Sequence, residues 1–273
     1  MSTLFITDLD GTLLRPDATL SEYSCREINA LVSEGVHISF ATARSRTTAL
    51  KVTRGITLSL PMVAYNGAFI VDTLTGEILH KNVFSPAQAE EIYRCFRGNG
   101  LSPVVYRINE GRELYSYDTL TISRQTRDFL DSRRGDPRDD PLEGDGGILS
   151  GEVFYFNCIG EREQLLSAYE CLRDRYEVLF YDDLYSNERW LEIMPKGANK
   201  AASAVKLKEL LGCDRIVAFG DSVNDLSLFE EADECYAVAN AKEQVKAAAT
   251  GVILSNEEDG VVRKIRELTL NEK

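Results

Sequence analysis

The sequence predicts an α/β protein that has a parallel-sheet core and an inserted α+β unit. Near both ends of the chain, short apolar runs alternate with segments of helical periodicity, as is typical of parallel strands connected by helices. Between them, strands joined by a hairpin signal replace that rhythm. Several apolar runs end in polar side chains, and open α/β sheets bind ligands beyond the carboxyl ends of their strands. We expect the core at residues 1–82 and 188–273 and the insertion at residues 83–187.

The stretch Leu4–Leu14 is predicted to begin as a buried strand that ends at two aspartates. Asp8 and Asp10 flank a single residue, so the backbone must leave the strand near Leu9 if both carboxylates are to act on one ligand. Gly11 permits that bend because glycine carries no steric penalty in turn conformations. Two neighbouring carboxylates on a buried platform repel each other unless a cation or a shared proton intervenes. A hard divalent cation with oxygen ligands is therefore expected here.

The alternation continues up to residue 81. Ser21 and Ser45 are each expected to cap a helix. The apolar runs 36–41 and 61–64 predict two further strands, and the order of strands and helices implies a parallel sheet. The residues that follow these strands are Thr42, Ala43 and Arg44 after the first, and Asn66 in a turn after the second.

The expected insertion begins with a helix that Ser85 caps, with proline at the first helical position. Residues 133–147 mix Gly, Pro, Asp and Arg without periodicity and are predicted to be a mobile loop. The other expected elements are strands at 101–108, 112–117, 152–159 and 177–181 and helices at 121–132 and 161–175.

The core is expected to resume with a strand at 189–194 and a helix from Ala198 that holds Lys200 in its first turn. The strand 215–219 then leads into the acidic stretch Gly220–Asp225, which opens the next helix. The remaining expected elements are a strand at 235–239, a helix at 243–249, a strand at 252–254 and a helix from Glu258. Four polar clusters are thus expected at strand ends or helix starts.

Composition limits the possible functions. The net charge of −13 over 273 residues argues against binding to nucleic acid or to an anionic membrane. The six cysteines form no Cys-x-x-Cys pair and there are only two histidines, which argues against a zinc site, a disulfide framework or a Ser-His-Asp triad. Asp8 and Asp10 interrupt the first apolar run, so we expect no signal peptide and a cytoplasmic location. A monomer or a weak homo-oligomer is expected.

Four motifs, in order, resemble those of the haloacid dehalogenase superfamily of aspartyl-phosphate phosphatases. Asp8-Leu9-Asp10-Gly11-Thr12-Leu13 resembles the first motif, and Ala41-Thr42-Ala43-Arg44 resembles the second, with Ala43 where the subgroup usually has glycine. Lys200 is similar to the third motif, and we prefer it to the nearby Lys196. Gly220–Asp225 resembles the fourth motif and is the most specific of the four. The turn at Asn66-Gly67, Asn240-Ala241 and Asp259-Gly260-Val261 resemble signatures of the Cof-type (type IIB capped) branch.

The resemblance implies a Rossmann-like core, a type IIB cap and a Mg²⁺-dependent phosphatase that acts on small phosphorylated metabolites, such as sugar phosphates. Asp8 would be the nucleophile and Asp10 the general acid and base, with Thr42 and Lys200 completing the catalytic set. Mg²⁺ would be held by Asp8, the backbone carbonyl of Asp10, Asp221 and Asp225, the last directly or through water. The groups implied to bind the substrate are Leu9 through its amide, Thr42, Ala43, Arg44, Asn66, Lys200 and Asn224.

Several alternatives remain open at this level. A phosphomutase or phosphotransferase would use the same Asp8 and Asp10 but pass the phosphoryl group to another hydroxyl. A phospho-accepting signalling module also uses Asp, Thr, Lys and Mg²⁺, although such modules are about half this length and lack a cap. A true dehalogenase does not need the magnesium loop. In the insertion, side chains that could face a substrate or simply face solvent are Tyr106, Arg107, Glu110, Arg112 and Tyr115.

Overall fold

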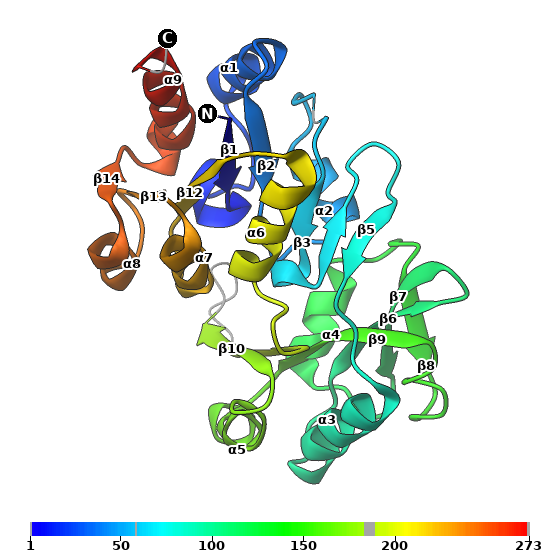
Figure 1. Cartoon of the computed structure of the whole chain (residues 1–273). Coiled ribbons are helices and arrows are strands. Elements are labelled where there is room, and N and C mark those ends of the chain that lie inside the picture. The colour runs from blue at the N-terminus through cyan, green and yellow to red at the C-terminus, as the bar shows by residue number, and fades with distance from the viewer. Residues whose placement is uncertain (1, 58, 183–188, 272–273) are drawn as a thin grey trace. The chain divides into compact units, whose positions relative to one another are not determined.

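The structure is a computed structural model that describes residues 2–57, 59–182 and 189–271 (Figure 1). The chain forms two compact units. The first contains Met1–Lys81 and Ala198–Lys273, and the second contains Asn82–Gly197. Among the helices in the described part of the chain, none combines the length and the hydropathy that a membrane crossing requires.

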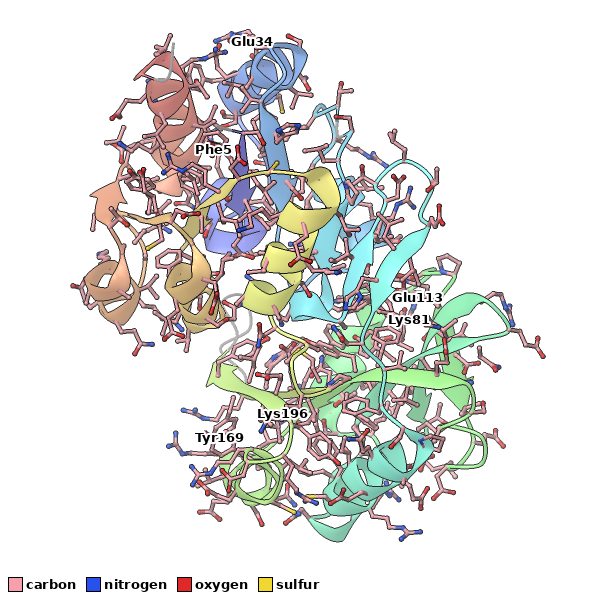
Figure 2. The ribbon with its side chains drawn as sticks, in the orientation of Figure 1. Phe5, Glu34, Lys81, Glu113, Tyr169 and Lys196 are labelled. Atoms are coloured by element: carbon pink, nitrogen blue, oxygen red, sulfur yellow. The ribbon has the colours of Figure 1, made fainter. Side chains whose placement is uncertain are left out.

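The first unit is built on a five-stranded sheet in which all neighbouring strands are parallel, as predicted. The strand order is β14–β13–β12–β1–β2, so β1 lies between β12 and β2. Every residue of β1 is buried, including Phe5 at its centre (Figure 2). Burial on both faces explains why this strand is a nearly continuous apolar run. The bounds are Thr3–Thr7 (β1), His37–Phe40 (β2), Arg215–Gly220 (β12), Glu234–Val238 (β13) and Gly251–Ile253 (β14).

Side-chain caps start the first two helices of this unit where the sequence predicts them. Ser21 accepts a hydrogen bond from the amide of Ser24, and Ser45 accepts one from the amide of Thr48. α6 and α7 pack against each other and against β12, and they lie in front of the sheet in Figure 1. The helices are α1 (Glu22–Ser33), α2 (Arg46–Val52), α6 (Lys200–Leu211), α7 (Leu226–Glu231), α8 (Glu243–Ala248) and α9 (Gly260–Asn271).

The predicted strand 61–64 exists as β3 (Met62–Ala64), but it does not extend the parallel ladder. A single parallel bridge between Ala41 and Val63 connects it to the end of β2. The chain then reverses through Asn66, whose φ is 52°, so β3 pairs antiparallel with β4 (Phe69–Val71), which pairs with β5 (Ile78–Lys81). The turn after the strand, not the strand itself, determines this pairing.

The second unit is a six-stranded sheet in the order β10–β11–β9–β6–β7–β8, antiparallel except between β7 and β8. Apolar side chains of α3 and α5, such as Phe96 and Leu165, join Phe156 of β9 in one buried core. Tyr169 of α5 stacks on Phe180 of β10 with ring centroids 5.5 Å apart (Figure 2). The bounds are Pro86–Gly98 (α3), Val104–Asn109 (β6), Arg112–Asp118 (β7), Arg124–Asp131 (α4), Asp139–Leu142 (β8), Glu152–Ile159 (β9), Arg162–Leu172 (α5), Glu177–Asp182 (β10) and Arg189–Met194 (β11).

The prediction of a mobile loop at 133–147 is wrong, because β8 lies within it and pairs with β7. Ion pairs of two buried arginines, in place of apolar side chains, connect this segment to β6 and β7. Arg107 of β6 donates to Asp140 of β8 at 2.6 Å, and Arg138, directly before β8, donates to Glu113 of β7 at 2.6 Å. Charged residues that pair across a fold leave no apolar alternation in the sequence, so the strand was not recognised.

The predicted end of the insertion, between residues 187 and 188, lies outside the described residues, but the strand that follows contradicts it. β11 was expected in the core, and it instead pairs antiparallel with β9 and β10 in the second unit. Residues 189–197 therefore belong to that unit, and the core resumes at Ala198. An apolar run predicts that a strand exists but does not indicate which sheet it joins.

Candidate active site

The backbone turns sharply directly after β1. The amide of Asp8 still bonds to the carbonyl of Phe219 at 3.0 Å, as if the strand continued, and the amide of Leu14 then closes a wide turn on the carbonyl of Leu9 at 2.8 Å. Within that turn Gly11 has a φ of 79°. A Cβ at this position would lie 2.6 Å from Oδ2 of Asp221, so both the backbone conformation and the close approach of the acidic loop require glycine.

Lys200 connects two aspartates in the interior of the first unit. Its Nζ donates to Oδ1 of Asp8 at 2.7 Å and to Oδ1 of Asp225 at 2.7 Å. Lys200 is 1 % exposed, Asp8 is 5 % exposed and Asp225 is fully buried. A lysine buried in the first turn of a helix faces an unfavourable dipole, and the two carboxylates offset that cost. Lys196, the alternative in the sequence, is exposed and lies in the second unit (Figure 2).

The acidic loop after β12 is fixed by its own hydrogen bonds. Oδ2 of Asp225 accepts the amides of Asp221 and Ser222, each at 3.0 Å. Thr12 donates its hydroxyl to Oδ1 of Asp221 at 2.6 Å, which connects this loop to the turn after β1. Both oxygens of Asp225 are therefore engaged with protein donors, whereas Oδ2 of Asp221 faces Gly11.

Three buried carboxylates gather at this edge of the sheet. Asp8, Asp221 and Asp225 each offer an oxygen, and these atoms lie within 4.8 Å of one another. Lys200 contacts two of these three carboxylates, those of Asp8 and Asp225, so the cluster carries excess negative charge when ionised. Oxygen donors and excess negative charge are what Mg²⁺ requires, so the residues fit this ion. Among the described residues this is the one group of acidic, histidine or cysteine side chains close enough to hold a metal.

The carboxylate of Asp10 points to a different partner from that of Asp8. Arg44 forms a bidentate pair with it, from Nε to Oδ2 at 2.7 Å and from a terminal nitrogen to Oδ1 at 2.5 Å. Both side chains are about one-fifth exposed, at 22 % and 21 %. Such a fork fixes orientation more tightly than a single contact. The two aspartates of the first motif are thus directed to separate cations, Lys200 and Arg44.

The remaining predicted residues lie in the same unit. Thr42 is fully buried, and its hydroxyl accepts the amide of Arg44 at 3.1 Å. Asn66 accepts a hydrogen bond from the side chain of Asn224 at 3.2 Å, and its amide donates to the carbonyl of Thr42 at 2.9 Å. Leu9 has a fully buried side chain and Ala43 is half-buried, so any role of these two in binding rests on their backbone.

Burial dominates the electrostatics of the cluster. It raises the pKa of Asp8 well above the usual value, a shift that Lys200 opposes and that Asp225, Asp221 and Asp10 reinforce. Burial, reinforced by Asp225, also raises the pKa of Asp221 to about 7. Burial would lower the pKa of Lys200, but Asp225 and Asp8 outweigh it and raise that pKa. Lys200 therefore stays charged, while the acidic cluster favours a bound proton or a bound cation.

This electrostatic arrangement predicts how the stability of the metal-free protein depends on pH. Between the usual aspartate pKa of 3.8 and the value of about 7 for Asp221, the folded state binds more protons than the unfolded state. The free energy of unfolding should therefore fall as pH rises across this window. Thermal unfolding in EDTA should give a higher midpoint at pH 5.5 than at pH 8, and Asp221→Asn should flatten the slope. A midpoint that rises between these two pH values in the wild type would contradict the prediction.

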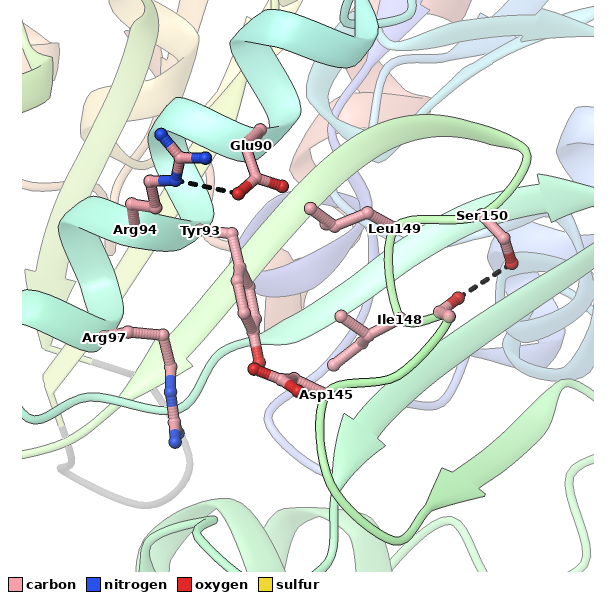
Figure 3. A pocket seen from close by; sticks show the side chains of 9 residues that line it. Glu90, Tyr93, Arg94, Arg97, Asp145, Ile148, Leu149 and Ser150 are labelled. Carbon is pink, nitrogen blue, oxygen red and sulfur yellow. Dashed lines mark hydrogen bonds and ion pairs between the residues drawn. The ribbon is translucent and has the colours of Figure 1, made fainter.

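Sequence reasoning assigned no role to the hydroxyl of Thr12, although it lies in the first motif. Its 2.6 Å bond to Asp221 joins residues 209 positions apart, so no local pattern could indicate it. The second unit has a pocket of about 390 Å³ between α3 and the loop around residues 145–150 (Figure 3). There Arg94 pairs with Glu90, and Arg97 donates to Thr121. The catalytic residues predicted from the motifs all lie in the first unit.

Comparisons with known proteins point to one family of hydrolases. The family model of haloacid dehalogenase-like hydrolases matches residues 5–265. YitU and YwtE of Bacillus subtilis, both named as 5-amino-6-(5-phospho-D-ribitylamino)uracil phosphatases, are each 26% identical to this chain. The match covers 97% of this chain and 96% of YitU, and 96% of both this chain and YwtE.

A solved structure of a haloacid dehalogenase-like hydrolase from Bacteroides thetaiotaomicron has a similar fold. Its TM-score is 0.77 at 26% identity, over 98% of this chain and 100% of that one. The family model spans nearly the whole chain, including both motifs that contain the carboxylate cluster. The chain therefore belongs to the haloacid dehalogenase-like hydrolase family.

Proposed function

We propose that the protein is a Mg²⁺-dependent phosphatase that hydrolyses small phosphorylated metabolites through an aspartyl-phosphate intermediate. The observation that carries this proposal is the buried contact of Lys200 with Asp8, 2.7 Å long, beside the carboxylate of Asp221. A buried carboxylate next to a fixed cation and a metal-type donor set fits a nucleophile that must approach an anionic phosphate. The named activity of the relatives points in the same direction.

In the first step, an oxygen of Asp8 forms a bond to phosphorus while the bond from phosphorus to the leaving oxygen breaks. Asp10 donates its proton to that leaving oxygen. In the second step, Asp10 takes a proton from water, the water oxygen bonds to phosphorus, and the bond between Asp8 and phosphorus breaks. The enzyme returns to its starting state with alcohol and inorganic phosphate as products. General acid–base assistance of this kind contributes about 10²–10⁴-fold.

The other predicted residues would bind and orient. Lys200 offsets charge between Asp8 and the phosphoryl group, and Thr42 and Asn224 donate to the phosphoryl oxygens. Arg44 holds the carboxylate of Asp10 in a bidentate pair. Its backbone N–H donates a hydrogen bond to the hydroxyl of Thr42, which places Arg44 close to the proposed phosphoryl position. Amides of Leu9 and Ala43 and the side chain of Asn66 are the further proposed contacts.

Mg²⁺ would be held by Asp8, Asp221 and the backbone carbonyl of Asp10. Asp225, whose two oxygens already bond to Lys200 and to two amides, would support it through water. When bound, the ion supplies positive charge that offsets the nucleophile and the phosphoryl group. The unit Asn82–Gly197 is proposed to be the cap that selects the leaving group, which is consistent with its independent hydrophobic core.

The test is phosphate release from a panel of phosphorylated metabolites, with Mg²⁺ and with EDTA. The panel should include sugar phosphates and the phosphoribitylamino-uracil that gives the relatives their name. We expect release from a few members that depends on Mg²⁺. An isomerised product without free phosphate would instead indicate a phosphomutase. No turnover of any member by folded, Mg²⁺-saturated protein would contradict the proposal.

A further inference from the structure

Two asparagines outside the predicted catalytic set hold the turn that carries the nucleophile. Asn240, in the turn after β13, donates its side-chain amide to the carbonyl of Gly11 at 2.7 Å. Its side-chain oxygen accepts the backbone amide of Asn256 at 3.0 Å. The side chain of Asn256 in turn donates to the carbonyl of Leu14 at 2.7 Å. The two side chains thus bind the carbonyls at both ends of the segment Gly11–Leu14.

The same turn also holds the acidic loop. The amide of Lys242 donates to the carbonyl of Asp221 at 3.0 Å. Residues 240–242 therefore contact both the turn after β1 and the loop after β12, which supply different members of the carboxylate cluster. The hydrogen bond from the hydroxyl of Thr12 to Asp221 connects the same turn directly to the same loop.

An asparagine side chain suits this task because it donates and accepts at the same time. Asn256 is 6 % exposed, so its amide would be left without a partner if the carbonyl of Leu14 moved away. Asn240 is exposed, so its side chain contributes little packing and its bonds are its main contribution. A segment that contains a glycine at a φ of 79° has high intrinsic freedom, and such a segment needs external bonds to hold one conformation.

We propose that Asn240 and Asn256 are positioning residues that fix the spacing between the carboxylates of Asp8 and Asp221, and thereby set the affinity of the site for Mg²⁺. This inference rests on the proposed function, because it assumes that the cluster binds the ion. Neither side chain is proposed to touch the metal or the substrate. They act through Gly11, Leu14 and the loop that holds Asp221.

The experiment compares Asn240→Ala and Asn256→Ala with a matched control. Like Asn240, Asn29 in the first unit uses its side chain both as a donor and as an acceptor to the backbone. It donates to the carbonyl of Gly55 at 2.7 Å and accepts the amide of Thr57 at 2.7 Å. Asn29→Ala therefore removes equivalent bonds whose partners, Gly55 and Thr57, belong to neither the turn after β1 nor the acidic loop. The readout is the dissociation constant of Mg²⁺, measured by titration calorimetry on the full chain without substrate.

We expect Mg²⁺ binding to weaken by about 10–100-fold in Asn240→Ala and Asn256→Ala, as is typical when a residue behind the metal ligands is removed. Asn29→Ala should bind Mg²⁺ as the wild type does. Asn240→Gln, which keeps the amide, should recover part of the affinity. In turnover assays, Asn240→Ala should lower the apparent Mg²⁺ affinity by a larger factor than it lowers kcat at saturating Mg²⁺.

Two outcomes separate the failure of this inference from the failure of the proposed function. If the wild type binds Mg²⁺ and all three alanine variants bind it equally well, the positioning role is wrong and the metal site stands. If the wild type binds no Mg²⁺, the metal site fails and this inference fails with it. Because Asn240 is exposed, we expect Asn240→Ala to keep the fold even if Asn256→Ala does not.

Discussion

Asp8→Asn should abolish phosphate release, by on the order of 10³-fold or more, while the protein stays folded. The amide has the size of the carboxyl group but cannot form the acyl-phosphate bond. Its oxygen can still accept the bond from Lys200, which is 2.7 Å from Oδ1 in the wild type. Because burial raises the pKa of Asp8, the ionised carboxylate is itself costly, so a neutral replacement should not lower stability at pH 8 in EDTA.

The measurement is single-turnover and steady-state phosphate release beside thermal unfolding. Asp17→Asn is the matched control, since Asp17 is an exposed aspartate in the segment that follows the same turn. It should turn over at the wild-type rate. If Asp8→Asn retained phosphate release, the assignment of Asp8 as the nucleophile would be wrong. If Asp8→Asn failed to fold, the expectation that the carboxylate of Asp8 is not needed for stability would be wrong.

Lys200→Met should lower the free energy of unfolding by about 3–5 kcal/mol at pH 8, the range for removal of one partner from a buried ion pair. The substitution leaves Asp8 and Asp225 buried without the cation that both contact at 2.7 Å. Catalysis should be lost as well, because Lys200 is the cation that offsets the charge of Asp8, the proposed nucleophile. The loss of stability should shrink toward pH 5, since Asp8, with its raised pKa, can then bind a proton.

Urea unfolding of the metal-free protein at the two pH values tests this. Lys206→Met is the control on the same helix: its ion pair with Glu209 is about half exposed, and such pairs contribute about 0–1 kcal/mol. Equal losses in the two variants would show that the buried pair contributes no more than a surface pair. If the loss of stability in Lys200→Met were the same at both pH values, protonation of Asp8 would not be what reduces the destabilisation at low pH.

The sequence indicated the core well because the signals there are local. The run that forms β1, the caps Ser21 and Ser45, and the turn conformation of Gly11 each depend on neighbours in the chain. The order of motifs also predicted which strand ends would supply the carboxylates, since parallel strands direct their carboxyl ends to one edge. These features follow from hydrophobic periodicity and from the backbone preferences of single residues, both of which can be read from a short window of the sequence.

Other features depended on partners far along the chain. The sequence predicted β11 as a strand but placed it in the wrong sheet. It did not predict β8, which is connected to its neighbours by the ion pairs of Arg107 with Asp140 and of Arg138 with Glu113. In the site, the motifs named Asp10 and Arg44 separately, and only the fold pairs them across 34 positions. Ion pairs and hydrogen bonds between distant segments form only when the fold brings both segments together. They therefore produce no periodic pattern in the sequence.

What the sequence determined by itself was the set of chemical groups: two aspartates after the first strand, a lysine at a helix start and an acidic loop. What the tertiary structure decided was how those groups divide their roles. It placed Lys200 between Asp8 and Asp225, directed Asp10 to Arg44, and connected the turn after β1 to the acidic loop through Thr12. The reason is physical: a residue type fixes which bonds a side chain can form, whereas burial and distance decide which of those bonds exist and how they shift its pKa.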